Sequence, residues 1–307
     1  MSAIELPTSA VQTPDRILRR LDWQVIRRLD GLLQGDYRTL FFGTGIDFTD
    51  LREYQPMDDI RHIDWNVTAR MNNIYVRQYV EDREITAWFL LDLSPSMAFG
   101  RKDRTKRTVM IEVVATLARL LTRNGNRVGA MLFNNRLAGT IPPRGGRIQV
   151  LRLIREMLAE GDPPAGDSTD LSPLLHAAIN TIKRRSIVFL ISDFFSEPGW
   201  ERPLTLLNRR HELIAIRTFD ALESELPDAG LIVVEDAETG EQILVDTSSL
   251  AFRRRFQEIS RGRETLLQET LKQAGVDLFT ISTGEKLVPA IVRMAALRKR
   301  RKRRSRI

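Results

Sequence analysis

The chain has 307 residues, 42% of them hydrophobic and 28% charged, which is enough for a globular protein of one or two domains with a sizeable core. It contains no cysteine, which excludes a disulfide framework, a thiol nucleophile and cysteine-based metal sites. No apolar run approaches the roughly 18 residues of a membrane span, and residues 1–15 lack the apolar centre of a signal peptide. These features predict a cytoplasmic protein.

The net charge of +7 comes from the carboxyl-terminal end. Residues 298–307 hold eight Lys and Arg, and the rest of the chain has 39 Lys and Arg against 40 Asp and Glu. Such a tail attracts nucleic acid, anionic lipid or an acidic protein, and lipid contact would place the protein peripherally at the inner face of the membrane. The alternative interpretation is a solvated, disordered terminus that aids solubility.

Hydrophobic periodicity predicts the elements in chain order. Residues 1–14 are expected to be disordered, and apolar spacing predicts a helix over 15–34. The charged and aromatic segment 36–83 favours short strands and turns over a regular helix. Further strands are expected in 74–92 and at 127–133, 137–141, 186–192, 212–218, 231–235, 242–246 and 277–282. Helices are expected at 105–124, 148–158, 171–182, 200–209, 250–273 and 287–297, with a loop at 162–169.

The alternation of strands with helices of ten or more residues predicts right-handed crossovers and a mostly parallel sheet covered on both faces. We therefore predict an α/β fold with a doubly wound sheet over residues 84–297 and a hairpin inserted near 220–248. Residues 15–83 would form a small, charged helix-plus-strand module packed on this domain. Residues 298–307 would remain a basic tail.

Three oxygen-bearing side chains, Asp92, Ser94 and Ser96, follow a run of five apolar residues. The carboxyl ends of strands are where an open α/β sheet holds its site, and these oxygens suit Mg²⁺ or Mn²⁺. The same pattern also caps ordinary turns, so the cluster alone is weak evidence. Thr169 before a helix and Asp193 after a second apolar strand strengthen it, because their loops can converge on the same edge.

Five of these positions resemble the metal-ion-dependent adhesion site (MIDAS) of von Willebrand factor A domains, namely Asp92, Ser94, Ser96, Thr169 and Asp193. The resemblance implies a von Willebrand factor A-like, Rossmann-like fold. It also implies that Asp92 and the two serines ligate Mg²⁺ directly or through water, while Thr169 and Asp193 complete the shell. One position would stay open for an acidic residue of a partner. Asp170 follows Thr169, and the sequence leaves open which of the two faces the metal.

Longer segments resemble the bacterial family called domain of unknown function fifty-eight (DUF58). They lie at 47–54, 58–65, 69–70 and 75–77, with further similarity at 141–146 and 192–194. Proteins of this family are commonly encoded beside MoxR-type AAA+ ATPases and are thought to act with them. The resemblance therefore implies a non-enzymatic, Mg²⁺-dependent adaptor or co-chaperone in complex assembly, which grips an acidic residue on the ATPase or on a client protein.

Charges of alternating sign mark a second candidate surface, for partner docking, at Arg52, Asp58, Asp59, Arg61, Asp64 and Arg70. We favour an ion-pair network that holds the N-terminal module in place, because burying such charges unpaired costs several kcal/mol each. His62 lies among these acids and is interpreted as structural, since no nucleophile accompanies it.

Two other functions remain open from the sequence. A metal-dependent hydrolase would use Asp92 and Asp193, but the ligand set lacks an evident general base. A nucleic-acid or anionic-membrane binder would work through the tail, although few aromatic residues accompany it. No P-loop motif and no Gly-x-Ser-x-Gly elbow is present, and no small-molecule substrate is evident. We therefore predict that the chain is not an enzyme.

Overall fold

The computed structural model describes residues 13–32, 50–56, 58, 60, 63–71, 73–78, 84–101, 104–161, 168–237 and 239–304. Predictions for residues 1–12 and for most of the predicted loop at 162–169 fall outside this set. The chain divides into two compact units. The described residues up to 32 and from 85 to 294 form the larger unit, and those from 50 to 84 group with 295–304 in the smaller one.

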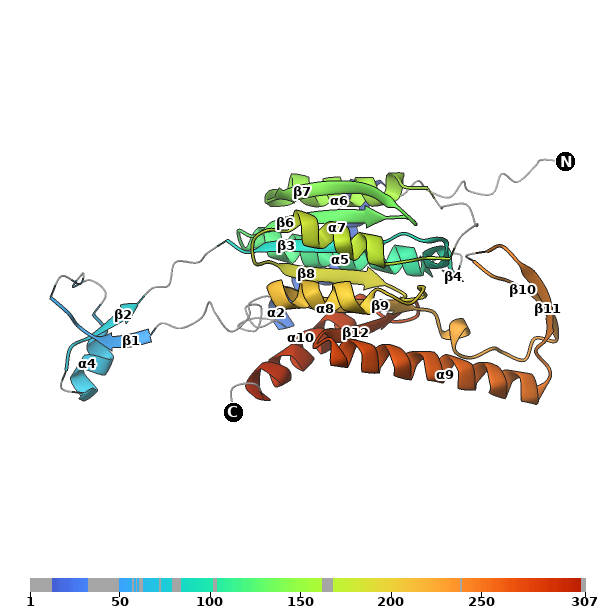
Figure 1. Cartoon of the computed structure of the whole chain (residues 1–307). Coiled ribbons are helices and arrows are strands. Elements are labelled where there is room, and N and C mark those ends of the chain that lie inside the picture. The colour runs from blue at the N-terminus through green and yellow to red at the C-terminus, as the bar shows by residue number, and fades with distance from the viewer. Residues whose placement is uncertain are drawn as a thin grey trace. The chain divides into compact units, whose positions relative to one another are not determined.

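A six-stranded sheet forms the centre of the larger unit, in the order β12-β9-β8-β3-β6-β7 (Figure 1). Neighbouring strands run parallel except at β7, which pairs antiparallel with β6. The predicted α/β fold with a mostly parallel sheet is thus confirmed. The strands are β3 (Thr86–Asp92), β6 (Arg127–Phe133), β7 (Leu137–Arg144), β8 (Ile187–Ser192), β9 (Glu212–Phe219) and β12 (Asp277–Ser282).

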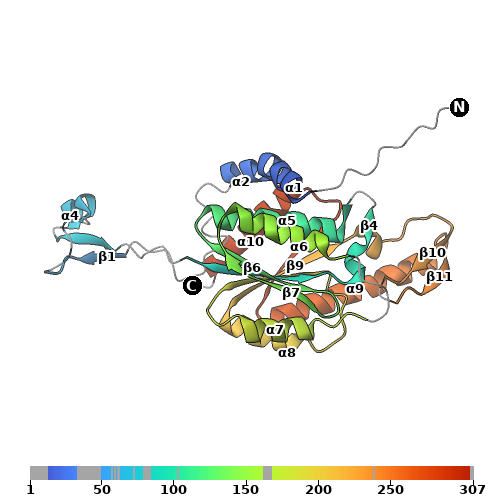
Figure 2. The same ribbon diagram turned by 90° about the horizontal axis from the view of Figure 1, so that it is seen from above.

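Helices cover both faces of this sheet (Figure 2). On one face lie α5 (Lys106–Arg123) and α6 (Gly146–Ala159), and α1 (Pro14–Leu21) packs against both. On the other lie α7 (Ser172–Thr181) and α8 (Glu201–Arg210). The remaining elements of this unit are the π-helix η1 (Asp22–Ile26), α2 (Arg27–Leu32), the 3₁₀ helices η3 (Pro95–Ala98) and η4 (Ala221–Glu223), β4 (Gly100–Arg101), β5 (Arg104–Thr105), α9 (Leu250–Gln273) and the start of α10 (Leu287–Arg304).

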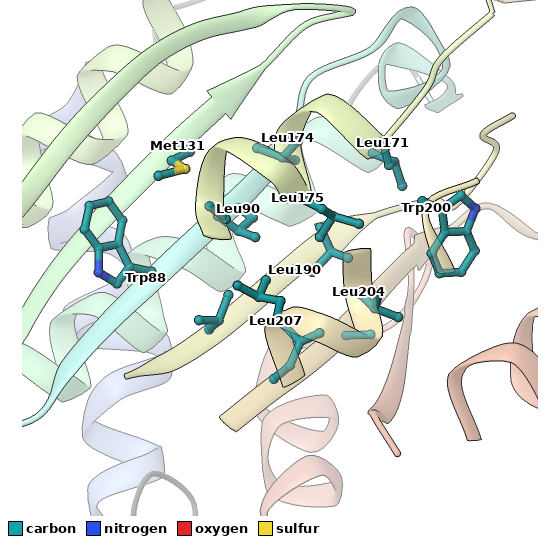
Figure 3. Close-up of a cluster of buried hydrophobic side chains, with 14 of the residues drawn as sticks. Trp88, Leu90, Met131, Leu171, Leu174, Leu175, Leu190, Trp200, Leu204 and Leu207 are labelled. Atoms are coloured by element: carbon teal, nitrogen blue, oxygen red, sulfur yellow. The ribbon is translucent and has the colours of Figure 1, made fainter. Parts of the chain in front are cut away.

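The central strand β3 buries side chains on both faces. Trp88 and Leu90 join a cluster with Leu174 of α7 and Leu207 of α8 (Figure 3). Successive side chains of a strand point to opposite faces, so Phe89 lies on the other side. There it stacks on Phe189 of β8, with ring centroids 5.2 Å apart. Burial on both faces explains the unbroken apolar run that precedes Asp92.

The predicted hairpin, β10 (Leu231–Glu235) and β11 (Gln242–Asp246), is separate from the main sheet. Most of its apolar side chains are solvent-exposed, with Leu231 at 69% and Leu244 at 65%. The helix that follows, α9, buries Leu271 near its carboxyl end and leaves apolar residues such as Leu266 exposed. Hairpin and helix extend beyond the end of the sheet (Figure 1).

The smaller unit contains β1 (Asp50–Glu53), α4 (Trp65–Met71) and β2 (Tyr75–Gln78), with β1 antiparallel to β2. The short strands predicted for this segment are present, but the expectation that it lacks a regular helix was wrong for α4. Seven residues are too few to display a helical hydrophobic period.

Two boundaries differ from those predicted. The helices of residues 14–32 belong to the larger unit, so the predicted 15–83 segment is divided between the two units. The helix expected to end at residue 297 continues to Arg304, through the first seven residues of the predicted tail. Arg and Lys are good helix formers, so a basic sequence does not by itself end a helix. No helix in the described part of the chain is long and apolar enough to cross a membrane.

Candidate functional site

The sheet changes winding direction at its centre. From β3 the chain crosses to β6 on one side, and it later returns to β8 on the other side of β3. The carboxyl ends of two such strands form a crevice, and open α/β sheets bind their ligands there. Asp92 ends β3, and Asp193 directly follows β8. The topology therefore brings two acids to one place from distant parts of the chain.

The carboxylate of Asp92 is fully buried among hydroxyl and amide groups. Its Oδ1 accepts a hydrogen bond from the backbone N of Ser94 at 3.0 Å, and its Oδ2 accepts one from Ser192 Oγ at 2.6 Å. Ser94 Oγ lies 3.1 Å from Ser96 Oγ, and both serines are buried at the start of η3. Asp92, Ser94 and Ser96, the three alternate residues of the predicted metal site, thus form one compact group of oxygens.

The ionised form of Asp92 is unfavourable in this buried position. Burial, together with the negative charge of Asp193, raises the pKa of Asp92 to about 6, although the hydrogen bonds from Ser192 and Ser94 oppose the shift. Within the described part of the chain, no salt bridge to Asp92 forms. A cation at this edge would favour the ionised carboxylate, and an oxygen-only donor set fits Mg²⁺ or Mn²⁺.

Asp193 is buried as well, but it has a cationic partner. Its Oδ1 accepts a hydrogen bond from the backbone N of Phe195 at 3.0 Å, and its Oδ2 lies 2.6 Å from Lys106 Nζ. Lys106 Nζ also contacts Glu223 Oε1 of η4. The side chain of Lys106 is completely buried, and that of Glu223 is 12% exposed. Burial is the main cause that raises the pKa of Glu223, against the influence of Lys106.

Thr169 and Asp170 take different roles. Thr169 is buried, and its Oγ1 donates to Oδ1 of Asn135, which follows β6, at 3.2 Å. Asp170 is half-buried, and its Oδ1 accepts from the backbone N of Ser172 at 2.8 Å, at the first residue of α7. Asp170 therefore helps to start a helix, and Thr169 contacts the loop that follows β6. Which of the two would face a cation stays a prediction.

Lys106 and Glu223 contribute charges to this edge that were not predicted. Lys106 is the first residue of α5, where a positive charge opposes the helix dipole, and this is the one local signal of a buried acidic partner. Glu223 gives no such signal, because η4 comprises three residues in an acidic loop.

Among the described residues, no group of three or more His, Asp or Glu side chains is arranged to hold a metal ion. A cation at the carboxyl edge would therefore depend on hydroxyl oxygens and water in addition to the carboxylates. This is the ligand composition that the resemblance to the adhesion site implies.

The predicted docking residues are only partly described. Asp59, Arg61 and the side chain of Arg52 lie outside the described set, and Arg70 is exposed on α4. Asp58 Oδ2 accepts from the backbone N of Gln55 at 2.8 Å. Asp64, which is buried, accepts from the backbone N of Val67 at 3.2 Å, at the start of α4. These acids hold local turns, and docking at this surface stays a prediction.

Comparison with known proteins identifies relatives along most of the chain. A family model described as "Protein of unknown function DUF58" matches residues 50–265. Uncharacterized protein Rv1480 of Mycobacterium tuberculosis and uncharacterized protein Mb1516 of Mycobacterium bovis are each 35% identical to this chain over 285 residues, which cover 92% of it and 89% of each relative.

Solved structures with a similar chain path include the conserved hypothetical protein BatB from Bacteroides thetaiotaomicron, at 14% identity and a TM-score of 0.45, over 70% of this chain and 99% of that chain. The SpRpn10 VWA domain matches at 12% identity and a TM-score of 0.37, over 68% of this chain and 94% of that domain. These likenesses are too distant to bear on function. The family match and the mycobacterial relatives, in contrast, show that this chain belongs to the DUF58 family.

Proposed function

We propose that this chain is a non-enzymatic protein-interaction module that holds Mg²⁺, or Mn²⁺ in its place, at the carboxyl edge of its sheet. The cation would bind an acidic residue of a partner protein. The observation that carries the proposal is the environment of Asp92, a fully buried carboxylate at the switch point of the sheet. Its hydrogen-bond donors are a hydroxyl and an amide, and its charged neighbour is a second acid, Asp193.

The ligands follow from this environment. Asp92, Ser94 and Ser96 would supply oxygens directly or through water, and Thr169 and Asp193 would complete the shell. Mg²⁺ takes about six oxygen ligands and keeps several waters readily, so one position can pass to a partner's carboxylate. When bound, the cation supplies the positive charge that such a carboxylate recognises, and the buried serines hold Asp92 in place.

We further propose, from membership in the DUF58 family, that the partner is a MoxR-type AAA+ ATPase or its client. The chain would then act as an adaptor or co-chaperone in complex assembly. A site that binds a partner's carboxylate through a cation suits this role. Such a contact forms and breaks with the cation and needs no large permanent interface.

Metal binding is tested by thermal unfolding with Mg²⁺, Mn²⁺ or Ca²⁺. A ligand that binds the native state raises stability by RT ln(1 + [L]/Kd). We expect Mg²⁺ and Mn²⁺ to raise the Tm of the wild type and of Asp170→Asn, the matched control, whose altered acid sits at a helix start. Asp92→Asn should lose the shift. An equal shift in Asp92→Asn would contradict the proposal.

Partner binding is tested separately by biolayer interferometry with the MoxR-type ATPase of the same organism. Binding should require Mg²⁺, disappear in EDTA and fail with the Ser94→Ala/Ser96→Ala double variant. Binding of equal strength in EDTA would show that the contact does not use the cation.

A further inference from the structure

Lys106 occupies an unusual place for a lysine. It is the first residue of α5, at the carboxyl edge of the sheet, and no part of its side chain reaches solvent. Nζ lies 2.6 Å from Asp193 Oδ2 and also contacts Glu223 Oε1. The rings of Phe99 and Phe195 flank the ammonium, with centroids 5.7 and 5.3 Å from Nζ. The side chain is therefore held in one position, between two carboxylates.

The charge on this lysine is maintained by its partners. Burial disfavours a charged ammonium, and the positive end of the helix dipole adds to the cost. The carboxylates of Asp193 and Glu223 outweigh burial and raise the pKa of Lys106 above its ordinary value. Lys106 thus brings a permanent positive charge to the same acid that the proposed cation would use.

Both oxygens of Asp193 are already engaged, one by the backbone N of Phe195 and the other by Lys106. A cation bound beside Asp92 would have to share the charge of Asp193 with the ammonium. Like charges repel at this range, and burial weakens the screening by water, so the ammonium lowers the affinity of the edge for any second cation.

The formal charges of the cluster match one divalent ion. The carboxylates of Asp193 and Glu223 contact the ammonium of Lys106, and the carboxylate of Asp92 lies close enough to Asp193 to feel its charge. These four groups together carry a surplus of two negative charges. Arg217 lies near this group but forms an ion pair with Glu264, so that pair adds no net charge. A divalent cation would neutralise the cluster, whereas a trivalent one would leave it positive.

We infer that the ammonium of Lys106 competes with a bound cation for the carboxylate of Asp193. This competition would set the affinity of the carboxyl-edge site for cations and its preference for divalent over trivalent ions. Glu223 moderates this competition, because it offers the ammonium a second carboxylate. The inference rests on the proposed metal-binding function and assigns to Lys106 and Glu223 a role that the five ligand positions do not include.

The test is isothermal titration calorimetry, which measures the affinity of the full-length chain for Mn²⁺ and, separately, for Tb³⁺. Lys106→Met should bind Mn²⁺ on the order of tenfold more tightly than the wild type, and the gain should be larger for Tb³⁺, because the repulsion scales with the charge of the ion. Lys106→Arg, which keeps the charge, should retain the wild-type preference. Weaker or unchanged Mn²⁺ binding by a folded Lys106→Met would overturn the inference and leave Lys106 a structural residue.

Glu223→Gln provides a second test, because it removes one negative charge from the cluster and leaves the ammonium of Lys106 in place. It leaves Lys106 with Asp193 as its acidic partner, so Mn²⁺ affinity should fall several-fold, and Tb³⁺ affinity should fall further. Unchanged or tighter Mn²⁺ binding by this variant would also overturn the inference. If neither the wild type nor any variant binds Mn²⁺ or Tb³⁺, the proposed function fails and takes the inference with it. If the wild type binds and the variants match it, the inference alone fails.

Discussion

Ser192 Oγ donates a 2.6 Å hydrogen bond to Asp92 Oδ2 and joins the ends of β8 and β3. The same hydroxyl oxygen accepts a hydrogen bond from the backbone N of Phe194 at 2.8 Å. One buried serine therefore holds the carboxylate at the centre of the candidate site and also the loop that carries Asp193. This arrangement makes Ser192 a support of the site, although it lies outside the predicted ligand set.

Replacing Ser192 with Ala should weaken both the fold and the site. The variant leaves Asp92 and the amide of Phe194 without their partner, which should lower the free energy of unfolding by about 1–3 kcal/mol in urea. Mn²⁺ affinity at neutral pH should also fall, because Asp92 loses a hydrogen bond that favours its ionised form.

The matched control is Ser186→Ala, just before the other end of β8, where the hydroxyl donates to Arg184 O at 2.8 Å. Ser186→Ala should lower the free energy of unfolding without altering the affinity for Mn²⁺. A similar loss of affinity in both variants would mean that the site responds to general destabilisation, not to Ser192.

The raised pKa of Asp92 predicts a specific pH dependence. Because the pKa is about 6 in the folded chain, above its unfolded value near 4, protonated Asp92 favours the native state. This contribution is fully present below about pH 4 and is lost as the pH rises through about 6. In EDTA, the stability of Asp92→Asn relative to wild type should increase by on the order of 2–3 kcal/mol between pH 4 and pH 7.5.

Urea denaturation across this range measures the effect, and parallel pH profiles for the two proteins would refute it. Excess Mg²⁺ should reduce the difference at pH 7.5, since the cation favours the ionised carboxylate of the wild type. The affinity of the wild type for Mg²⁺ should increase as the pH rises through about 6.

Phe194 has a backbone φ of 62°, in the left-handed region that non-glycine residues rarely adopt. Its ring packs against Trp200 with centroids 5.7 Å apart, which compensates for the conformation. Phe194→Ala and Phe194→Gly lose the same ring and should both destabilise the fold. Phe194→Gly should nevertheless be the more stable of the two by about 1 kcal/mol in urea denaturation, because glycine adopts this φ without strain. The opposite order would indicate that the backbone relaxes once the ring is removed.

The hairpin of β10 and β11 should be separable from the rest of the fold. Hydrogen bonds at its base close it independently, since Thr247 N donates to Gly230 O at 2.8 Å and Ala229 N donates to Thr247 Oγ1 at 3.0 Å. Replacing residues 231–246 with a short Gly-Ser linker should change the free energy of unfolding by less than about 1 kcal/mol, because the hairpin side chains are largely exposed. The Tm shift with Mg²⁺ should persist, and a large loss of stability would show that the hairpin supports the domain.

The sequence predicts the sheet well and the environment of the site less well, for different physical reasons. β8 was expected at 186–192 and spans Ile187–Ser192, because a strand buried on both faces appears as an unbroken apolar run. The approach of Asp193 to Asp92 followed from the rule that carboxyl ends of parallel strands share an edge. No such rule locates Lys106, whose partners Asp193 and Glu223 lie 87 and 117 positions away. Its burial depends on tertiary structure that local patterns do not encode.

The central position of β3 has a consequence for the order in which the chain folds during synthesis. β6 is made soon after β3 and can pair with it, but β8, which covers the other edge of β3, emerges about a hundred residues later, as the separation of Ser192 from Asp92 indicates. Until then β3 presents an open apolar edge, the kind of surface that chaperones protect and that otherwise aggregates. Lys106 has to wait as long, because its partner Asp193 directly follows β8.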